Sequence, residues 1–265
     1  MKNKRLIILI SIFCFVVLVV VLGSTVFTVQ KISFNWLSST NKLNEEFDYT
    51  AGVDMPMGNS VFFVNKEEII KNVEKANPYL QVVSVETSFP NRLTLHVAER
   101  ESLFAIQLQT GDYVVLDKEM KVLEFMDKVT YLGLNKTQKP ILVDLSETSY
   151  VFNSEDFVLG EKFKYENLTK VLEKLAYSFL SINYTPFTAK GIFESISIKI
   201  KLSEVISLST RYGLEIEIND AENLLTEKLN FGIACYNDIH DKGETEGTIS
   251  VYYSEKNNKI QASYS

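Results

Sequence analysis

The sequence predicts an α+β fold with an N-terminal transmembrane helix, a small strand-helix-helix-strand-strand domain, and a larger strand-rich domain with two helices. Three observations lead to this prediction. A charge-free apolar run lies near the N-terminus, a helical stripe flanked by alternating strands follows it, and short strands dominate the remainder. With 265 residues, 46% hydrophobic and 23% charged, the chain has a globular composition and room for two domains.

The first element is the apolar run at residues 6–30, which contains no charged residue. A helix of this length spans a hydrocarbon core of about 30 Å. Basic residues precede the run, so the positive-inside rule predicts a cytoplasmic tail at 1–5, a transmembrane helix at 6–28 and a body outside the membrane. A cleaved signal peptide is the alternative, although the run is longer than about 7–15 residues and no A-x-A motif follows it.

The remainder of the chain is acidic, and its cysteines are too few for a disulfide framework. The whole chain has 34 acidic and 27 basic residues, which argues against a large basic footprint for nucleic acid or anionic lipid. Cys14 lies in the apolar run and Cys235 lies on the apolar face of a predicted helix. We therefore predict no intrachain disulfide and interpret Cys235 as a buried structural thiol.

The small domain is predicted at residues 29–99. Alternation over 27–36 predicts a half-buried strand, 40–51 is a weakly helical stretch, and Asn65 with Glu68 forms a capping box that starts a helix ending before Pro78. Two alternating strands then flank a turn at 89–92. The inward-facing residues are predicted to form one core: Ile32, Phe34, Val73, Val83, Val85, Leu93, Leu95 and Val97.

The second domain is predicted at residues 100–255, after a charged junction at 99–101. Its sequence consists mostly of short alternating strands. Apolar residues at helical spacing predict one helix over 168–182 and another that begins at Asn219 and Asp220 and reaches Tyr236. Residues 248–253 form the last predicted strand, and 256–265 are predicted to be a flexible C-terminal tail.

An enzyme requires a constellation of reactive side chains, and the sequence offers none. His96 lies on the outer face of a predicted strand and His240 in a polar loop, and neither has metal-ligand spacing with Cys235. Phosphate loops, nucleophile elbows and zinc-protease motifs are missing from the sequence. Glu215 and Glu217 share one strand face, most simply a solvated one. We predict a non-catalytic protein without a cofactor or metal.

The order and spacing of several segments resemble the bacterial FtsQ/DivIB cell-division proteins, which carry a POTRA domain. In the small domain the similar segments are 57–65, 77–80, 83–85, 89–93 and 97–101. In the second domain they are 213–216, the helix that reaches Tyr236, and 247–253. This resemblance implies a single-pass type II protein of the bacterial cytoplasmic membrane that is enriched at the division septum. It also implies small single-pass coiled-coil partners of the FtsB/DivIC and FtsL type.

The leading hypothesis is therefore a divisome scaffold that binds other division proteins outside the membrane during septum formation. A POTRA-containing protein of outer-membrane assembly or secretion, binding client peptides by strand addition, is the alternative. That class usually has several POTRA modules and a transmembrane barrel, for which this chain has no room. A membrane-anchored wall-modifying enzyme is a third reading.

The main partner site is predicted on the last strand, because an outermost strand presents unpaired N–H and C=O groups. The resemblance also implies partner binding at the end of the β domain. Alternation predicts that Ile249, Val251 and Tyr253 face the core while Thr248, Ser250 and Tyr252 face the partner. An ordinary closing strand, with Tyr252 as a surface aromatic, is the alternative.

Overall fold

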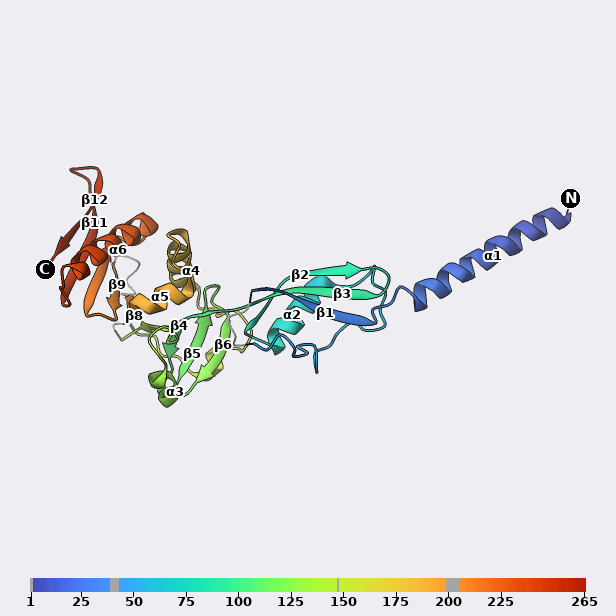
Figure 1. The fold of residues 1–265 in the computed structure, drawn as a ribbon, viewed down its shortest axis with the longest axis horizontal. Coiled ribbons are helices and arrows are strands. Elements are labelled where there is room, and N and C mark those ends of the chain that lie inside the picture. The colour runs from blue at the N-terminus through green and yellow to red at the C-terminus, as the bar shows by residue number, and fades with distance from the viewer. Residues whose placement is uncertain (1, 39–42, 147, 199–204) are drawn as a thin grey trace. The chain divides into compact units, whose positions relative to one another are not determined.

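The computed structural model describes residues 2–38, 43–146, 148–198 and 205–265. The chain divides into two compact units, Met1–Arg100 and Glu101–Ser265, which we call unit 1 and unit 2 (Figure 1). Both combine helices with β-sheet, so the fold belongs to the α+β class that the sequence predicts. The elements of unit 1 are α1 (Lys2–Thr25), β1 (Lys31–Ser38), α2 (Lys66–Ala76), β2 (Leu80–Ser88) and β3 (Arg92–Glu99).

The helix α1 contains 24 residues and ends before residue 28, where the sequence predicts its end. The residues after Thr25 pair with a later loop: Thr28 forms a bridge with Ser60, and the N–H of Val61 donates to the carbonyl of Phe27 at 2.9 Å. In the described part of the chain we find no helix long and apolar enough to cross a membrane.

A three-stranded sheet in the order β1-β3-β2 forms the base of unit 1, with β1 parallel and β2 antiparallel to β3. The helix α2 packs on this sheet and connects β1 to β2. The predicted cap of this helix is confirmed, because the Asn65 side chain accepts a hydrogen bond from the N–H of Glu68. Ile69 and Val73 face the core from α2.

The predicted helix over 40–51 is wrong where the structure describes it, while residues 39–42 lie outside the described residues. Residues 43–51 form turns instead. Asn44 and Asp48 side chains accept bonds from backbone N–H groups two residues ahead, at 2.9 Å in both cases. Such local bonds offer the backbone an alternative to the helix. Tyr49 fixes the loop by packing into the core of unit 1.

The prediction that Val83 faces the core is also wrong. The register between β2 and β3 shifts between Val82 and Ser84, so a β-bulge turns Val83 outward. Val83 is 53% exposed, whereas Val82 and Val85 are both 5% exposed. The remaining predicted residues join the core of unit 1, with Ile32 and Phe34 half-buried at its border.

The charged junction at 99–101 is predicted from charge alone, but Arg100 is buried. Its guanidinium Nη2 lies 3.1 and 3.2 Å from the two carboxylate oxygens of Glu74 on α2. The same carboxylate accepts a hydrogen bond of 2.8 Å from the N–H of Val82, next to the bulge. One buried acid therefore ties α2 to the start of β2 and to the end of unit 1.

Unit 2 is built on a nine-stranded mixed sheet in the order β12-β11-β10-β9-β8-β7-β4-β5-β6. Its strands are β4 (Ser102–Gln107), β5 (Tyr113–Asp117), β6 (Val122–Met126), β7 (Ile141–Asp144), β8 (Phe193–Ile198), β9 (Val205–Thr210), β10 (Leu214–Asn219), β11 (Gly247–Ser254) and β12 (Lys259–Tyr264). Its helices are α3 (Lys128–Gly133), α4 (Glu166–Ser181), α5 (Pro186–Ile192) and α6 (Leu225–Asp241).

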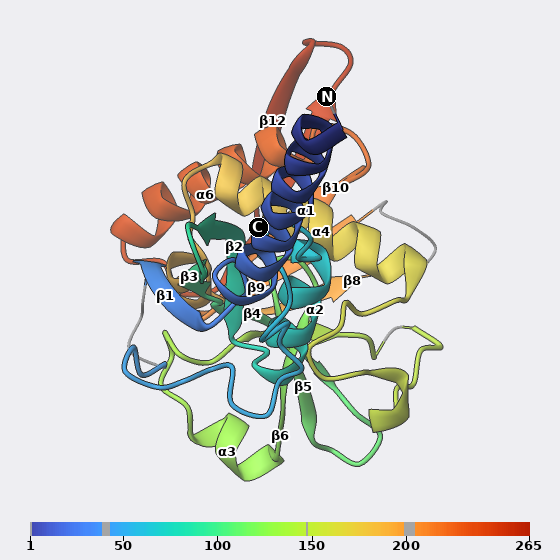
Figure 2. The same cartoon turned by 90° about the vertical axis from the view of Figure 1, so that its right-hand side faces the viewer.

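The described part of unit 2 contains four α-helices rather than the predicted two. The long helices α4 and α6 are the two that the sequence predicts. The short helices α3 and α5 have 6 and 7 residues, too few for a repeated apolar stripe. The hairpin turn between β11 and β12 projects beyond the neighbouring strands in Figures 1 and 2.

Candidate partner-binding surface

The predicted site residues lie on β11. Ile249 and Val251 are fully buried against the core of unit 2, as the alternation predicts. Thr248 and Ser250 are half-buried, and Tyr252 is exposed.

Tyr253 departs from the predicted pattern, because it is exposed instead of facing the core. The reason is that β10 pairs with β11 only as far as Val251. Beyond that point β11 is paired with β12 alone, and Tyr253 lies opposite Ile260 in the projecting hairpin. Its hydroxyl donates to the side-chain oxygen of Asn258 in the hairpin turn.

The premise that β11 is the outermost strand is wrong. The strand is parallel to β10 on one side and antiparallel to β12 on the other. The predicted flexible tail at 256–265 is wrong for the same reason, because residues Lys259–Tyr264 form β12. The signal was present in the sequence: Ile260, Ala262 and Tyr264 alternate with polar residues after a polar turn.

The edge strand next to β11 is therefore β12. Its hydrogen bonds to β11 show which backbone groups face outward. Thr248 and Ser265 exchange both backbone bonds, at 2.9 and 3.1 Å. Such pairs alternate along an antiparallel ladder, so Ser263 and Gln261 also bond toward β11. The N–H and C=O groups of Ile260, Ala262 and Tyr264 consequently point away from β11. This row is a template for an additional strand.

At Gly247, the first residue of β11, the C-terminal residues Tyr264 and Ser265 approach the backbone closely. The φ of Gly247, 128°, is a backbone conformation that side chains disfavour. A Cβ at this position would lie 2.6 Å from the ring of Tyr264 and 2.8 Å from the carbonyl oxygen of Ser265. The Tyr264 hydroxyl donates to the carbonyl of Glu246 at 2.7 Å. The lack of a side chain at Gly247 thus permits the closure of β12 on β11.

The helix α6 supports these strands from the core side at close range. Gly232 faces the sheet, and a Cβ there would lie 2.8 Å from Ile216 on β10 and 3.1 Å from Val251 on β11. Both neighbours have β-branched side chains with little rotameric freedom. Close packing at Gly232 therefore fixes the height of α6 above the two strands.

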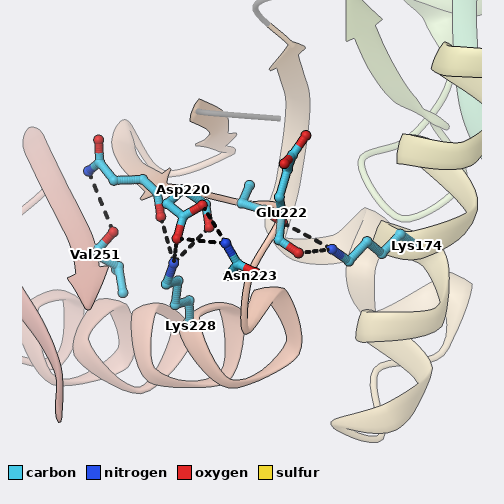
Figure 3. A network of polar contacts seen from close by, with 8 residues as sticks. Lys174, Asp220, Glu222, Asn223, Lys228 and Val251 are labelled. Atoms are coloured by element: carbon cyan, nitrogen blue, oxygen red, sulfur yellow. Dashed lines mark hydrogen bonds and ion pairs between the residues drawn. The ribbon is translucent and has the colours of Figure 1, made fainter. Parts of the chain in front are cut away.

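The loop between β10 and α6 is held by two lysines from different helices (Figure 3). Lys228 of α6 is fully buried, and its Nζ donates to the carbonyls of Asn219 and Asp220 at 2.9 and 2.7 Å. Lys174 of α4 donates to the carbonyls of Ala221, at 3.3 Å, and Glu222. These bonds pair the carbonyls of four consecutive loop residues, 219–222, with lysine ammonium groups.

The same loop corrects the predicted start of the last helix. The sequence predicts a helix from Asn219 and Asp220, but α6 begins at Leu225. Asp220 and Leu224 have φ values of 49° and 54°, in the left-handed region that a helix cannot include. The ammonium of Lys228 donates to carbonyls of this turn, and Leu224 at the N-cap position makes no side-chain capping bond.

Polar groups on the outer face link β10 to β11. The Glu217 carboxylate accepts bonds from the Ser250 hydroxyl at 3.2 Å and from the Asn219 amide at 3.3 Å. Glu215 and Glu217 are half-buried on this face, where the sequence predicts a solvated one. The outer face is therefore an ordered polar surface that leads to the exposed ring of Tyr252.

The residues with potential for chemistry are dispersed. Cys235 is half-buried on α6, and burial raises the pKa of its thiol, which disfavours the reactive thiolate. His240 lies in the last turn of α6 rather than in a loop, with its ring stacked on Tyr236. His96 of unit 1 bonds the side chain of Asn35 at 2.9 Å. Among the described residues, no His, Cys, Asp and Glu side chains are grouped as a metal site.

The structure combines a small α+β unit with a larger unit whose sheet ends at β12. Residues 49–100, which include α2, β2 and β3, match the family model described as POTRA domain, FtsQ-type. The chain is 28% identical over 204 residues to Cell division protein DivIB of Clostridium botulinum strain Hall, covering 75% of this chain and 72% of that protein.

Two further relatives carry the same name. DivIB of Clostridium botulinum strain Loch Maree is 26% identical, over 75% of this chain and 72% of the relative. DivIB of Clostridium tetani is 25% identical, over 74% and 66%. The FtsQ-type POTRA match and these relatives support the resemblance to the FtsQ/DivIB cell-division proteins that the sequence indicates.

Proposed function

We propose that this protein is a non-catalytic, membrane-anchored scaffold of the bacterial divisome, which binds other division proteins outside the cytoplasmic membrane during septum formation. The observation that carries the binding mechanism is the row of outward N–H and C=O groups on β12. The family relatives, which are named as division proteins, support the cellular role. The partners are small single-pass coiled-coil division proteins of the FtsB/DivIC and FtsL type.

The anchor in this proposal is α1, with the tail 1–5 in the cytoplasm and the two units outside. Support comes from the sequence, in which 25 consecutive uncharged residues follow a basic N-terminus. The described apolar side chains of α1, from Ile8 to Val21, are all exposed, with no core to cover them. We propose residues 29–99 and 100–255 as the two extracytoplasmic domains, the second extended by β12.

The partner contributes a strand that pairs with β12 in this proposal. Its backbone bonds the outward groups of Ile260, Ala262 and Tyr264, and its side chains lie over both faces of the sheet. On the outer face, Ser250 and Tyr252 of the predicted site are second neighbours of the added strand. They supply side-chain contacts rather than backbone bonds.

Ala262→Pro tests strand addition. The substitution removes an outward N–H but no bond to β11, and proline is tolerated at an edge whose N–H faces solvent. We expect the tagged full-length protein to lose capture of the coiled-coil division proteins from a membrane extract of the source bacterium. Ala262→Thr is the matched control because it keeps the N–H, and it should retain capture.

Unchanged capture by a folded Ala262→Pro variant would overturn strand addition at β12. A second arm addresses topology, because protease added to intact spheroplasts should digest both units. Protection of residues 31–265 would refute the extracytoplasmic position. Recovery of a mature N-terminus near Thr25 would refute the uncleaved anchor.

A further inference from the structure

Exposed phenylalanines of unit 1 gather around Phe27, which is half-buried against its core; Phe62 and Phe89 contact its ring, and Phe63 follows Phe62 in the chain. The ring of Phe27 lies 5.6 Å from that of Phe62 and 5.0 Å from that of Phe89. Phe62, Phe63 and Phe89 are 65%, 89% and 75% exposed. We call Phe27, Phe62, Phe63 and Phe89 the aromatic patch. Exposed aromatic rings that gather around one half-buried ring indicate an interaction surface rather than scattered surface residues.

Backbone bonds hold the aromatic patch together from three separate segments. The N–H of Val61 donates to the carbonyl of Phe27, and Val29 donates to Asn59, both at 2.9 Å. Gln30 donates to the carbonyl of Asn91 in the β2–β3 turn at 2.9 Å. Figure 1 shows this turn and the start of β1 at the same end of unit 1. The patch is therefore part of the folded unit, not a loose linker.

The aromatic patch is also tied to the end of α1 by the chain itself. Phe27 follows Thr25, the last residue of α1, by two residues, which limits their separation to about 7 Å whatever the direction of the helix. The polar interface on each side of a bilayer is about 5–7 Å thick. If α1 spans the membrane, the patch begins within the depth of the lipid headgroups.

Two cations lie beside the aromatic patch. Lys31 and Arg92 are directly paired across β1 and β3, at the start of both strands, and both are exposed. Lys31 follows the Gln30–Asn91 contact, and Arg92 follows the turn that contains Phe89. Although the whole chain is acidic, this end of unit 1 combines aromatic rings with local positive charge, which suits an interface of anionic lipids.

We propose that the aromatic patch of unit 1 inserts its exposed rings into the lipid interface at the outer surface of the membrane. This inference rests on the proposed function in one respect, that α1 is the membrane anchor. The partner surface is the boundary between headgroups and acyl chains, where phenylalanine rings bury apolar area and the adjacent cations meet lipid phosphates. Docking restrains the tilt of unit 1, so that its other end points away from the membrane.

Quenching of tryptophan fluorescence by lipids brominated near the headgroup end of their acyl chains tests this contact. The full chain is reconstituted into phosphatidylcholine–phosphatidylglycerol vesicles. Its one tryptophan is first removed by Trp36→Phe, and Phe62→Trp then introduces the probe. Leu37→Trp is the matched control, because Leu37 is 55% exposed on the same unit but about 20 Å along β1 from Lys31. Val19→Trp, within α1, reports the anchor.

We expect strong quenching for Phe62→Trp and Val19→Trp and little for Leu37→Trp. Quenching of Val19→Trp without quenching of Phe62→Trp would overturn the proposal and leave the anchor intact. Equal quenching of Phe62→Trp and Leu37→Trp would overturn it too, because contact would not be specific to the patch. Absence of quenching for Val19→Trp would refute α1 as the membrane anchor. It would also remove the reason to place the aromatic patch at the depth of the lipid headgroups.

A second probe covers the possibility that Trp36→Phe impairs folding. A nitroxide is attached through Phe89→Cys in a chain that carries Cys14→Ser and Cys235→Ser but keeps Trp36. Docking predicts that the nitroxide is more accessible to oxygen, which concentrates in lipid, than to a water-soluble nickel complex. The reverse preference would overturn the proposal.

Discussion

The buried pair of Glu74 and Arg100 gives the sharpest stability prediction for unit 1. Both side chains are largely excluded from water, and Glu74 accepts two bonds from Arg100 and one from the N–H of Val82. Glu74→Met keeps most of the side-chain volume but leaves a guanidinium and an N–H buried without this acceptor. Breaking a buried ion pair from one side costs about 3–5 kcal/mol, and we expect a loss of this size in the free energy of unfolding.

The chain carries its own reporter for this measurement. Trp36 is the one tryptophan, it lies on β1, and its ring packs edge-on against Tyr49 at 5.9 Å. Urea unfolding followed by tryptophan emission therefore reports on unit 1, whatever unit 2 does. Glu67→Gln removes an exposed carboxylate from the same helix, and this matched control should cost no more than about 1 kcal/mol.

A double-mutant cycle separates the interaction energy between Glu74 and Arg100 from the effect of each substitution alone. Arg100→Met alone leaves the Glu74 carboxylate buried with fewer partners and should also be strongly destabilising. The double variant removes both charges, so it should be more stable than the sum of the single losses implies, by about 1–3 kcal/mol. Additive losses, or a loss below about 1 kcal/mol for Glu74→Met, would refute the account of Glu74 as the link between α2 and β2.

Two further predictions concern the bulge in β2 and a buried tyrosine of unit 2. Val82→Thr should cost unit 1 about 1–3 kcal/mol, whereas Val83→Thr should stay within about 0.5 kcal/mol; equal losses in the tryptophan assay would place the bulge elsewhere. Burial raises the pKa of Tyr131, so its contribution is complete below the unfolded pKa of about 10 and declines as pH rises above it. Unfolding followed by circular dichroism at about pH 8 and about pH 10.5 should show a smaller alkaline loss for Tyr131→Phe than for the parent, and equal losses would contradict this.

The sequence could predict elements whose signal is local. The cap at Asn65, the stripe of α4 and the alternation of β11 depend on residues within a few positions of each other, and the structure contains all three. The prediction of side-chain direction failed at Val83 because one inserted residue in a strand reverses the faces that the following residues occupy. Nothing in the sequence at that position marks a bulge. The charged junction at 99–101 gives no sign that Arg100 is buried, because its partner, Glu74, is on a different element.

The position of a strand within its sheet is a long-range property, and this limited the prediction of the site. Alternation correctly indicated that Ile249 and Val251 are buried, but it does not identify the neighbours of β11. The short polar turn before Lys259 and the alternating Ile260, Ala262 and Tyr264 would have indicated a further strand. The polar residues of 256–265 favour a tail, whereas their alternation with apolar residues indicates a strand.

The correction at β12 changes which substitutions should matter most for partner binding. As far as Val251 both edges of β11 are occupied, so its backbone groups there are committed to β10 and β12 and cannot bond an incoming strand. Tyr252 lies opposite Gln261, so a partner paired with β12 reaches it only across that strand, a second-neighbour contact between long side chains. Tyr252→Lys should therefore weaken capture less than Ala262→Pro does. If Tyr252→Lys alone abolishes capture while Ala262→Pro leaves it intact, the partner contacts the outer face of the sheet rather than its edge.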